Sequence, residues 1–185
     1  MKIRAAVLDS MGIAPPYARS RPLRIAEVEL APPGPGEVLI KVAAAGLCHS
    51  DLSVINGDRP RPMPMALGHE ASGVVQALGE GVADLVPGDP VVVVFVPSCG
   101  AGLPPSTAVL PLPAVSLVAE ERTLKGSYIG TCVPSRDIPR YLALYAQGRL
   151  PVDRLLTGRL PLEQINEGFD LLHEGKAIRQ VVTFE

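Results

Sequence analysis

The chain has 185 residues, a length typical of one large domain. Hydrophobic residues make up 47% and charged residues 19% of it, a composition that excludes an intrinsically disordered chain. The net charge is only -2, and no block of lysine and arginine is interleaved with aromatic residues. We therefore expect neither a nucleic acid nor a membrane as partner, but a small molecule or another protein.

Cysteine usage and hydropathy both favour a cytoplasmic protein. The three cysteines, Cys48, Cys99 and Cys132, are too few and too widely separated for the disulfide framework of a small secreted protein. The apolar stretch at the N-terminus is interrupted at Asp9, and the longest apolar run, Val91–Val96, is far too short to span a bilayer. We expect a cytoplasmic protein whose thiols are available for metal binding or catalysis.

The first half of the sequence alternates short β-type runs with turn residues. Strands are predicted over residues 2–8, 23–30, 37–46, 72–79 and 90–96. Turns rich in proline and glycine, "PPGPGE" and "VPGD", precede two of these strands. Closely spaced strands of this kind favour a β-barrel or a β-sandwich.

The pattern changes after residue 96, where small residues and prolines dominate up to residue 113. We interpret the region near Gly100–Gly102 as a seam between two parts of the chain. A further strand is predicted over residues 123–131 and a closing strand over 178–184.

Two helices are predicted between these last strands. The first covers residues 135–150, with Ser135 or Asp137 as its N-cap and Gly148 at its end. The second covers residues 162–177. The apolar faces come from the helical spacing of Ile138, Tyr141, Leu142 and Tyr145 in the first helix, and of Ile165, Phe169 and Leu172 in the second.

The segment "GLCHSD", Gly46–Asp51, places a thiol, an imidazole, a hydroxyl and a carboxylate at consecutive positions. His69 follows in "GHE", 21 residues (69 − 48) after Cys48. Cysteine and histidine are natural zinc ligands, and a nearby carboxylate often orients a metal-binding histidine. Because no CxxC pair is present, the residues alone are equally consistent with a small buried Cys48 and a turn residue at His69.

Several segments together resemble the catalytic, GroES-like domain of the zinc-dependent alcohol dehydrogenases of the medium-chain family. They are "PGEVLIKVAAAGLCHSDLSVINGD", "LGHEASGVVQALGEGVADLVPGDPVVV" and "PSCG", while "TLKGSYIGT" and "LPLEQINEGFDLLHEGKAIRQVV" are similar to the C-terminal segment of the family. The resemblance implies a mostly β fold with some helix. It places a GroES-like barrel at residues 1–99, a seam with a remnant of the nucleotide domain at 100–130, and the C-terminal helices and closing strand at 131–185.

The resemblance also implies a metal site and a second shell around it. Cys48 and His69 match zinc ligands of the family, and Glu70 matches a carboxylate near the metal that exchanges with water or substrate. Asp51 matches the carboxylate that supports the histidine. Zinc is the implied metal, and an alcohol or aldehyde is the implied substrate.

Other matched positions concern the proton and the cofactor NAD. Ser50 matches the hydroxyl that hydrogen-bonds the alcohol and begins a proton relay. His49 stands where the family has a residue that faces the cofactor and helps to relay the proton. Arg179 matches a position that reaches the pyrophosphate of the cofactor, although an arginine beside an edge strand is more often simply solvated.

The nucleotide-binding Rossmann domain of the family has no counterpart in this sequence. No GxGxxG motif is present, and the nearest string, Gly79–Asp84, has aspartate in place of the third glycine and lies between two predicted strands. The third zinc-ligating cysteine of the family is also missing. Cys99 resembles the first cysteine of the family's four-cysteine structural zinc lobe, but its three companions are absent.

The sequence is consistent with two functions. The first is a zinc-binding oxidoreductase domain that acts on alcohols or aldehydes, with reduced activity and weak NAD binding because the dinucleotide turn is missing. The alternative is a catalytically silent zinc-binding scaffold. We also expect copies of the chain to associate, because loss of a packed domain exposes apolar surface and a strand edge near the seam.

Overall fold

The structure, a computed structural model, describes residues 1–94, 114–119, 121 and 132–184. The chain divides into two compact units, one formed by Met1–Phe95 with Val152–Glu185 and the other by Val96–Pro151. The predicted seam, Cys99 and the strand predicted over residues 123–131 lie outside the described residues.

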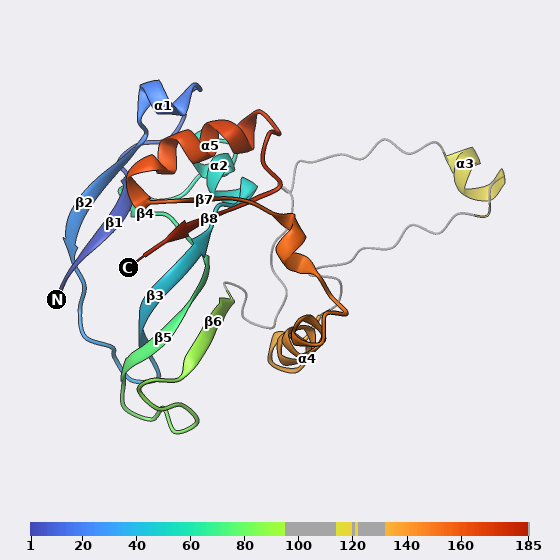
Figure 1. Cartoon of the computed structure of the whole chain (residues 1–185). Helices are drawn as coiled ribbons and strands as arrows, with labels where there is room; N and C mark the ends of the chain where they lie inside the picture. The colour runs from blue at the N-terminus through green and yellow to red at the C-terminus, as the bar shows by residue number, and fades with distance from the viewer. Residues whose placement is uncertain (95–113, 120, 122–131, 185) are drawn as a thin grey trace. The chain divides into compact units, whose positions relative to one another are not determined.

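Two β-sheets form the first unit (Figure 1). One has the strand order β2-β1-β4, and the other has the order β6-β5-β3-β8-β7. The strands are β1 (Lys2–Leu8), β2 (Leu23–Glu29), β3 (Val38–Gly46), β4 (Met65–Ala66), β5 (Glu70–Leu78), β6 (Pro90–Val94), β7 (Leu156–Leu160) and β8 (Arg179–Thr183). The strands predicted in the first half and the closing strand are confirmed wherever the structure describes them.

Pairing within the sheets is antiparallel with one exception. β1 and β2 pair over their full length, and Leu8 and Leu23, at one end of the ladder, are directly opposite each other and almost completely buried. The exception is the parallel pair β7 and β8, which the sequence analysis did not anticipate. Burial of paired apolar side chains at the end of β1 and β2 anchors this sheet on the core.

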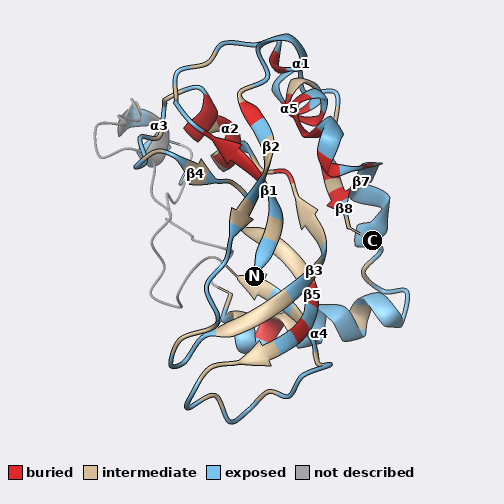
Figure 2. Cartoon of the chain, turned by 90° about the vertical axis from the view of Figure 1, so that its left-hand side faces the viewer, coloured by how far each residue is buried: buried red, intermediate tan, exposed pale blue. Residues whose placement is uncertain are grey.

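Three helices belong to this unit: α1 (Tyr17–Ser20), α2 (His49–Ile55) and α5 (Ile165–His173), with short 3-10 turns at Val152–Leu155 and Leu162–Gln164. α5 contacts both α1 and α2. The predicted apolar face of α5 is confirmed, because Ile165, Phe169 and Leu172 are all buried. Figure 2 shows that the buried residues gather around α2, α5 and the adjoining end of β1.

A buried polar side chain joins α5 to β2. The Asn166 side chain is 1% exposed, accepts a hydrogen bond from the Leu23 N–H at 3.1 Å and donates one to the Leu23 carbonyl at 2.8 Å. Both backbone groups of Leu23 are therefore satisfied inside the core. This contact fixes the helix on the sheet and was not predicted from the sequence.

Only one connection between parallel strands is seen in the described residues: β7 leads through α5 to β8. The link between β7 and α5, residues 161–164, reads "PLEQ" and has no glycine. A dinucleotide-binding turn needs glycines so that the backbone can approach the pyrophosphate closely. This βαβ unit therefore lacks the feature by which the Rossmann fold binds NAD.

The second unit contains α3 (Ala114–Ala119) and α4 (Pro134–Ala146). The predicted N-cap of α4 is wrong, because Val133 occupies that position and Pro134 begins the helix. Asp137 instead accepts a hydrogen bond from the Val133 N–H at 2.8 Å. Hydrogen bonding by the Arg136 guanidinium and then by this N–H holds the pKa of Asp137 well below its usual range.

The end of α4 agrees with the prediction. Gly148 follows the C-cap residue Gln147 and has a φ of 70°, a left-handed conformation that glycine adopts without strain. The predicted apolar face is present, but Tyr141, Leu142 and Tyr145 are all exposed.

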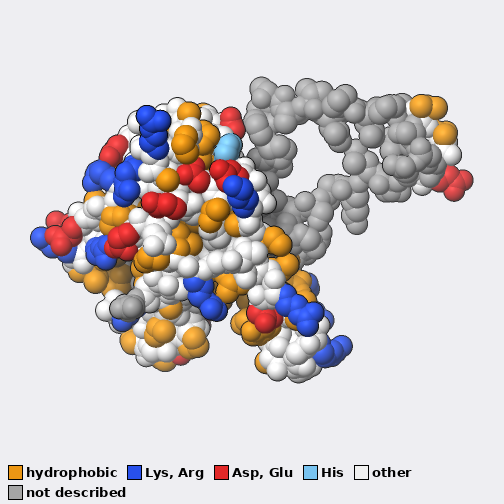
Figure 3. All heavy atoms as spheres, turned by 45° about the horizontal axis from the view of Figure 1, so that its top comes forward, with side chains coloured by type: hydrophobic (Ala, Val, Ile, Leu, Met, Phe, Trp, Pro, Cys, Tyr) orange, Lys and Arg blue, Asp and Glu red, His pale blue; other side chains and the backbone are white. Residues whose placement is uncertain are grey.

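The face of the molecule in Figure 3 carries side chains of both charges, and the acidic and basic ones are intermixed over it. Among the helices of the described part of the chain, none combines the length and apolar character needed to cross a membrane.

Candidate metal centre

Three side chains with metal-binding atoms meet where β3, α2 and β5 adjoin. β3 leads directly into α2, and Cys48 is the N-cap residue of that helix. β5 runs antiparallel to β3 with Ala45 opposite Ala71, so that Glu70, the first residue of β5, and His69 before it come to lie beside Cys48. The ligand atoms of Cys48, His69 and Glu70 all lie within 4.8 Å of one another.

Two glycines make this close approach possible. A methyl group added at Gly46, the last residue of β3, would lie 2.7 Å from Oε2 of Glu70, closer than non-bonded atoms approach. Gly68 precedes His69 and has a φ of 124°, in the region that favours glycine. Gly46 thus leaves space for the carboxylate of Glu70. Gly68 allows the turn by which the chain enters β5.

The imidazole of His69 is held by two neighbours on α2. Its Nδ1 lies 3.0 Å from Oδ1 of Asp51, and its Nε2 lies 2.9 Å from Oγ of Ser50. A carboxylate accepts only, so the geometry assigns the proton to Nδ1 and leaves the Nε2 lone pair directed towards Ser50. Ser50 Oγ also lies 3.2 Å from Sγ of Cys48, which places the hydroxyl between thiol and imidazole.

Asp51 is the buried member of this group, with 4% of its surface exposed. Burial raises the pKa of its carboxyl above the usual range, while the charge and hydrogen bond of His69 act in the opposite direction. An aspartate buried beside a histidine is the arrangement that fixes the orientation and tautomer of a metal-binding imidazole. The predicted pairing of Asp51 with His69 is thus present in the structure.

Glu70 has a second partner that the sequence did not reveal. Nη1 of Arg179, the first residue of β8, donates a hydrogen bond to Oε2 of Glu70 at 2.7 Å. Arg179 comes close because β8 pairs with β3, with Gly46 opposite Val181. Both side chains are partly exposed, so we expect the ion pair itself to contribute at most about 1 kcal/mol of stability.

His49 is a predicted site residue that does not join the group of metal-binding side chains. It is the first residue of α2, its side chain is exposed, and it is not part of the three-residue group. Its backbone carbonyl accepts a hydrogen bond from Ser53 Oγ at 2.9 Å. Of the predicted site residues, the structure brings together Cys48, Ser50, Asp51, His69, Glu70 and Arg179.

The donor set fits a zinc ion. Thiolate sulfur, imidazole nitrogen and carboxylate oxygen are its three usual protein ligands, and catalytic zinc sites commonly use three protein ligands and an open position. In a tetrahedral zinc site such donors are about 3.5 Å apart, given metal–ligand bonds of about 2.0–2.3 Å. The observed upper limit of 4.8 Å requires only small side-chain adjustments to reach that spacing.

Comparison with known proteins gives matches over the part of the chain that contains these residues. Residues 34–112 match the family described as the alcohol dehydrogenase GroES-like domain. An NDMA-dependent alcohol dehydrogenase of Amycolatopsis methanolica is 49% identical over 100 residues, which are 54% of this chain and 25% of that relative. Over these residues the chain is similar to alcohol dehydrogenases. The match covers only a quarter of the length of the relative.

Two solved structures of alcohol dehydrogenases share the fold. One is a benzyl alcohol dehydrogenase from Acinetobacter calcoaceticus, with a TM-score of 0.84, 15% identity and coverage of 100% of both chains. The other is an alcohol dehydrogenase zinc-binding domain protein from Burkholderia ambifaria, with a TM-score of 0.84, 17% identity and coverage of 100% of this chain and 99% of that one. The predicted GroES-like, mostly β fold is confirmed.

Proposed function

We propose that this alcohol dehydrogenase-type domain interconverts alcohols and aldehydes at the Cys48 site. The observation that supports this most directly is the convergence of Cys48, His69 and Glu70, with His69 oriented by the buried Asp51. In the oxidation direction the alcohol loses a proton from its oxygen and a hydride from its carbon, and a nicotinamide carrier accepts the hydride.

In this proposal Cys48, His69 and Glu70 hold a zinc ion. Zinc would supply a positive charge that stabilises negative charge on the substrate oxygen. Only one cysteine is present in the group, so the chain should bind zinc less tightly than a site with two cysteine ligands. Glu70 already forms an ion pair with Arg179. As a zinc ligand, its carboxylate would therefore bind the metal and the guanidinium together.

The remaining residues orient the substrate and move its proton. Ser50 Oγ both donates and accepts, and its place between Cys48 and His69 suits it to receive the proton of the substrate hydroxyl. His49 is one residue away on the exposed side of α2 and is the proposed next acceptor. Asp51 keeps the proton of His69 on Nδ1.

Cofactor contact is proposed at His49 and Arg179. Both side chains are exposed, and a guanidinium is well suited to a phosphate group. Contact of Arg179 with a phosphate would compete with its ion pair to Glu70. NAD binding should be weak, because the βαβ unit seen in the described residues lacks the glycine turn that holds a pyrophosphate.

Zinc content per chain is the first test, measured by elemental analysis on protein purified without chelator. About one zinc in the wild type, lost in His69→Ala, supports the site, whereas no zinc after purification with added metal contradicts it. Alcohol-dependent reduction of nicotinamide or a soluble dye then separates an enzyme from a silent zinc-binding scaffold. An enzyme loses that reduction in Cys48→Ala, while a scaffold shows none in the wild type.

A further inference from the structure

A small pocket beside the metal centre is lined by two arginines that the proposed chemistry does not use. Its volume is about 180 Å³, and Ser50, His69, Arg59 and Arg61 are all part of its wall. Arg59 is partly buried and Arg61 is exposed. The pocket therefore has two site residues, Ser50 and His69, and two permanently charged residues in its wall.

The arginines lie on a segment that is attached to its surroundings. The Arg59 N–H donates to the Ser53 carbonyl at 2.8 Å, which ties the segment to the last turns of α2. The Arg61 N–H lies 3.3 Å from Sδ of Met11, in the connection that follows β1. These contacts hold the backbone of both arginines at a fixed place relative to Ser50.

The two guanidinium groups have no acidic partner in the part of the chain that the structure describes. Other arginines in that part do have an acidic partner, as Arg24 has Asp9 and Arg179 has Glu70. The one carboxylate in the wall of the pocket is Asp51, which is buried and hydrogen-bonded to His69. The pocket thus presents uncompensated positive charge next to the atoms proposed to bind the substrate oxygen.

We propose that this pocket binds an anionic end of the substrate, so that the alcohol or aldehyde carries a carboxylate. This inference rests on the proposed function of the Cys48 site. A volume of about 180 Å³ equals the share of about six water molecules, which suffices for a carboxylate and a chain of two or three carbons. The planar guanidinium groups suit a carboxylate because they bind both of its oxygens. The substrate class is a short hydroxy acid or the corresponding oxo acid.

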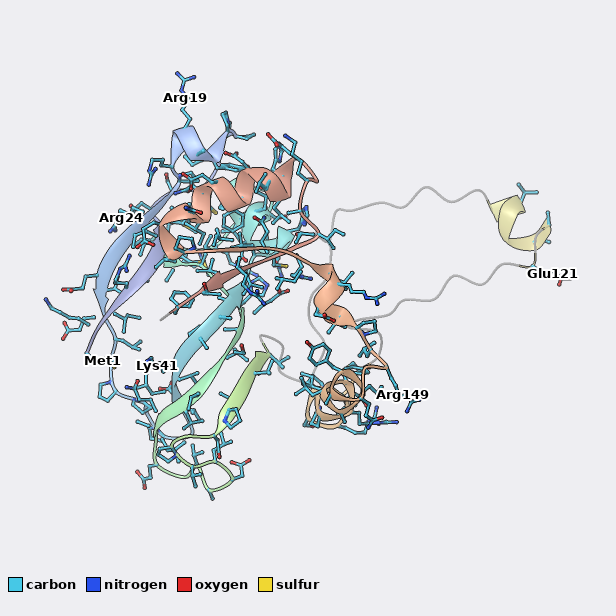
Figure 4. All side chains as sticks on the ribbon, in the orientation of Figure 1. Met1, Arg19, Arg24, Lys41, Glu121 and Arg149 are labelled. Atoms are coloured by element: carbon cyan, nitrogen blue, oxygen red, sulfur yellow. The ribbon has the colours of Figure 1, made fainter. Side chains whose placement is uncertain are left out.

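The test compares two probes of equal chain length, 3-hydroxypropanoate and 1,3-propanediol. Dissociation constants are measured by calorimetry on the zinc-loaded chain for the wild type, Arg59→Gln and Arg61→Gln. Arg19→Gln is the matched control, because Arg19 projects from α1 away from the domain (Figure 4). Thermal unfolding shows whether each variant remains folded, and Arg59→Lys shows whether charge alone restores binding.

The wild type should bind 3-hydroxypropanoate at least about tenfold more tightly than the diol, as expected for charge-assisted hydrogen bonds. Each pocket variant should lose about five- to tenfold in affinity for the acid alone, and Arg19→Gln should not change either constant. Equal binding of acid and diol by the wild type overturns the proposal. So does an equal loss of both ligands in the pocket variants, or the absence of binding by the acid.

Zinc content measured on the same preparations separates this proposal from the function on which it rests. If a chain without zinc binds the acid and this binding depends on the arginines, the result supports the proposed anion pocket and refutes the zinc site. If the chain holds zinc but binds acid and diol equally, the result supports the zinc site and refutes anion binding in the pocket.

Discussion

Replacement of Asp51 by asparagine tests whether the buried carboxylate prepares His69 for metal binding. Oδ1 of Asp51 lies 3.0 Å from Nδ1 of His69, and the side chain is almost completely buried, so the amide keeps the shape but removes the charge. Loss of such a partner weakens metal binding about 10- to 100-fold, which corresponds to about 1.4–2.8 kcal/mol. We expect Asp51→Asn to show this loss in competition with a chromophoric zinc chelator.

The unfolding free energy of the zinc-free chain is the control for this experiment. Burial raises the pKa of Asp51, which means that the charged carboxylate is poorly solvated in the folded chain. We therefore expect Asp51→Asn to change the stability of the zinc-free chain by no more than about 1 kcal/mol. Asp84→Asn, the same substitution at an exposed position, should change neither the zinc affinity nor the stability of the zinc-free chain. Wild-type zinc affinity in a folded Asp51→Asn variant would refute the role assigned to Asp51.

Three further predictions concern packing and charge. Asn166→Ala leaves the N–H and carbonyl of Leu23 buried without partners, so urea unfolding should show a loss of about 2–4 kcal/mol; a loss below 1 kcal/mol would contradict this account. Gly46→Ala adds a methyl group 2.7 Å from Oε2 of Glu70, so zinc affinity should fall while the fold measured by circular dichroism persists; unchanged affinity would contradict the close fit of Glu70 against Gly46. The lowered pKa of Asp137 means that its carboxylate stabilises α4 fully above the ordinary aspartate pKa of about 4 and ceases to do so as the pH falls through the lower folded-state value. The helical signal of Asp137→Asn should therefore be below that of the wild type at pH 7 and should equal it in strong acid; equal signals at pH 7 would exclude this contribution.

The strands of the first unit could be predicted because each is a β-type run bounded by turn residues. β3 and β5 were found within about two residues of their observed ends, since proline and glycine mark where each run stops. β4 and β7 were missed for physical reasons. β4 has two residues and shows no periodicity, and β7 contains Gly158 and pairs with β8, which is distant in sequence.

The start of α4 was mispredicted because N-cap propensity favoured a later residue than the proline that begins the helix. Ser135 and Asp137 are good N-cap residues, whereas Val133 is a poor one, so propensity alone favoured a later start. The structure begins the helix at Pro134, where the missing N–H costs no helical hydrogen bond. Asp137 then accepts a hydrogen bond from the N–H of the N-cap residue Val133, from a position inside the helix.

The candidate site was predicted in part because its residues lie in two short motifs. The motifs named Cys48, His69 and Glu70 but could not show that the three side chains meet, because that depends on the pairing of β3 with β5. The two arginines of the pocket escaped attention because they do not belong to either motif. Their significance comes from a position beside Ser50 that only the fold reveals.

The geometry of the metal centre is therefore a consequence of strand register. Ala45 pairs with Ala71, which puts Gly46 next to Glu70, and a side chain at position 46 would displace that carboxylate from its observed place. Successive residues of a strand point to opposite faces, so a shift of one position would turn Glu70 away from Cys48 and place another side chain beside the thiol. The site and the sheet are thus specified together, and variants that disturb the β3–β5 ladder should lose zinc affinity in step with their loss of stability.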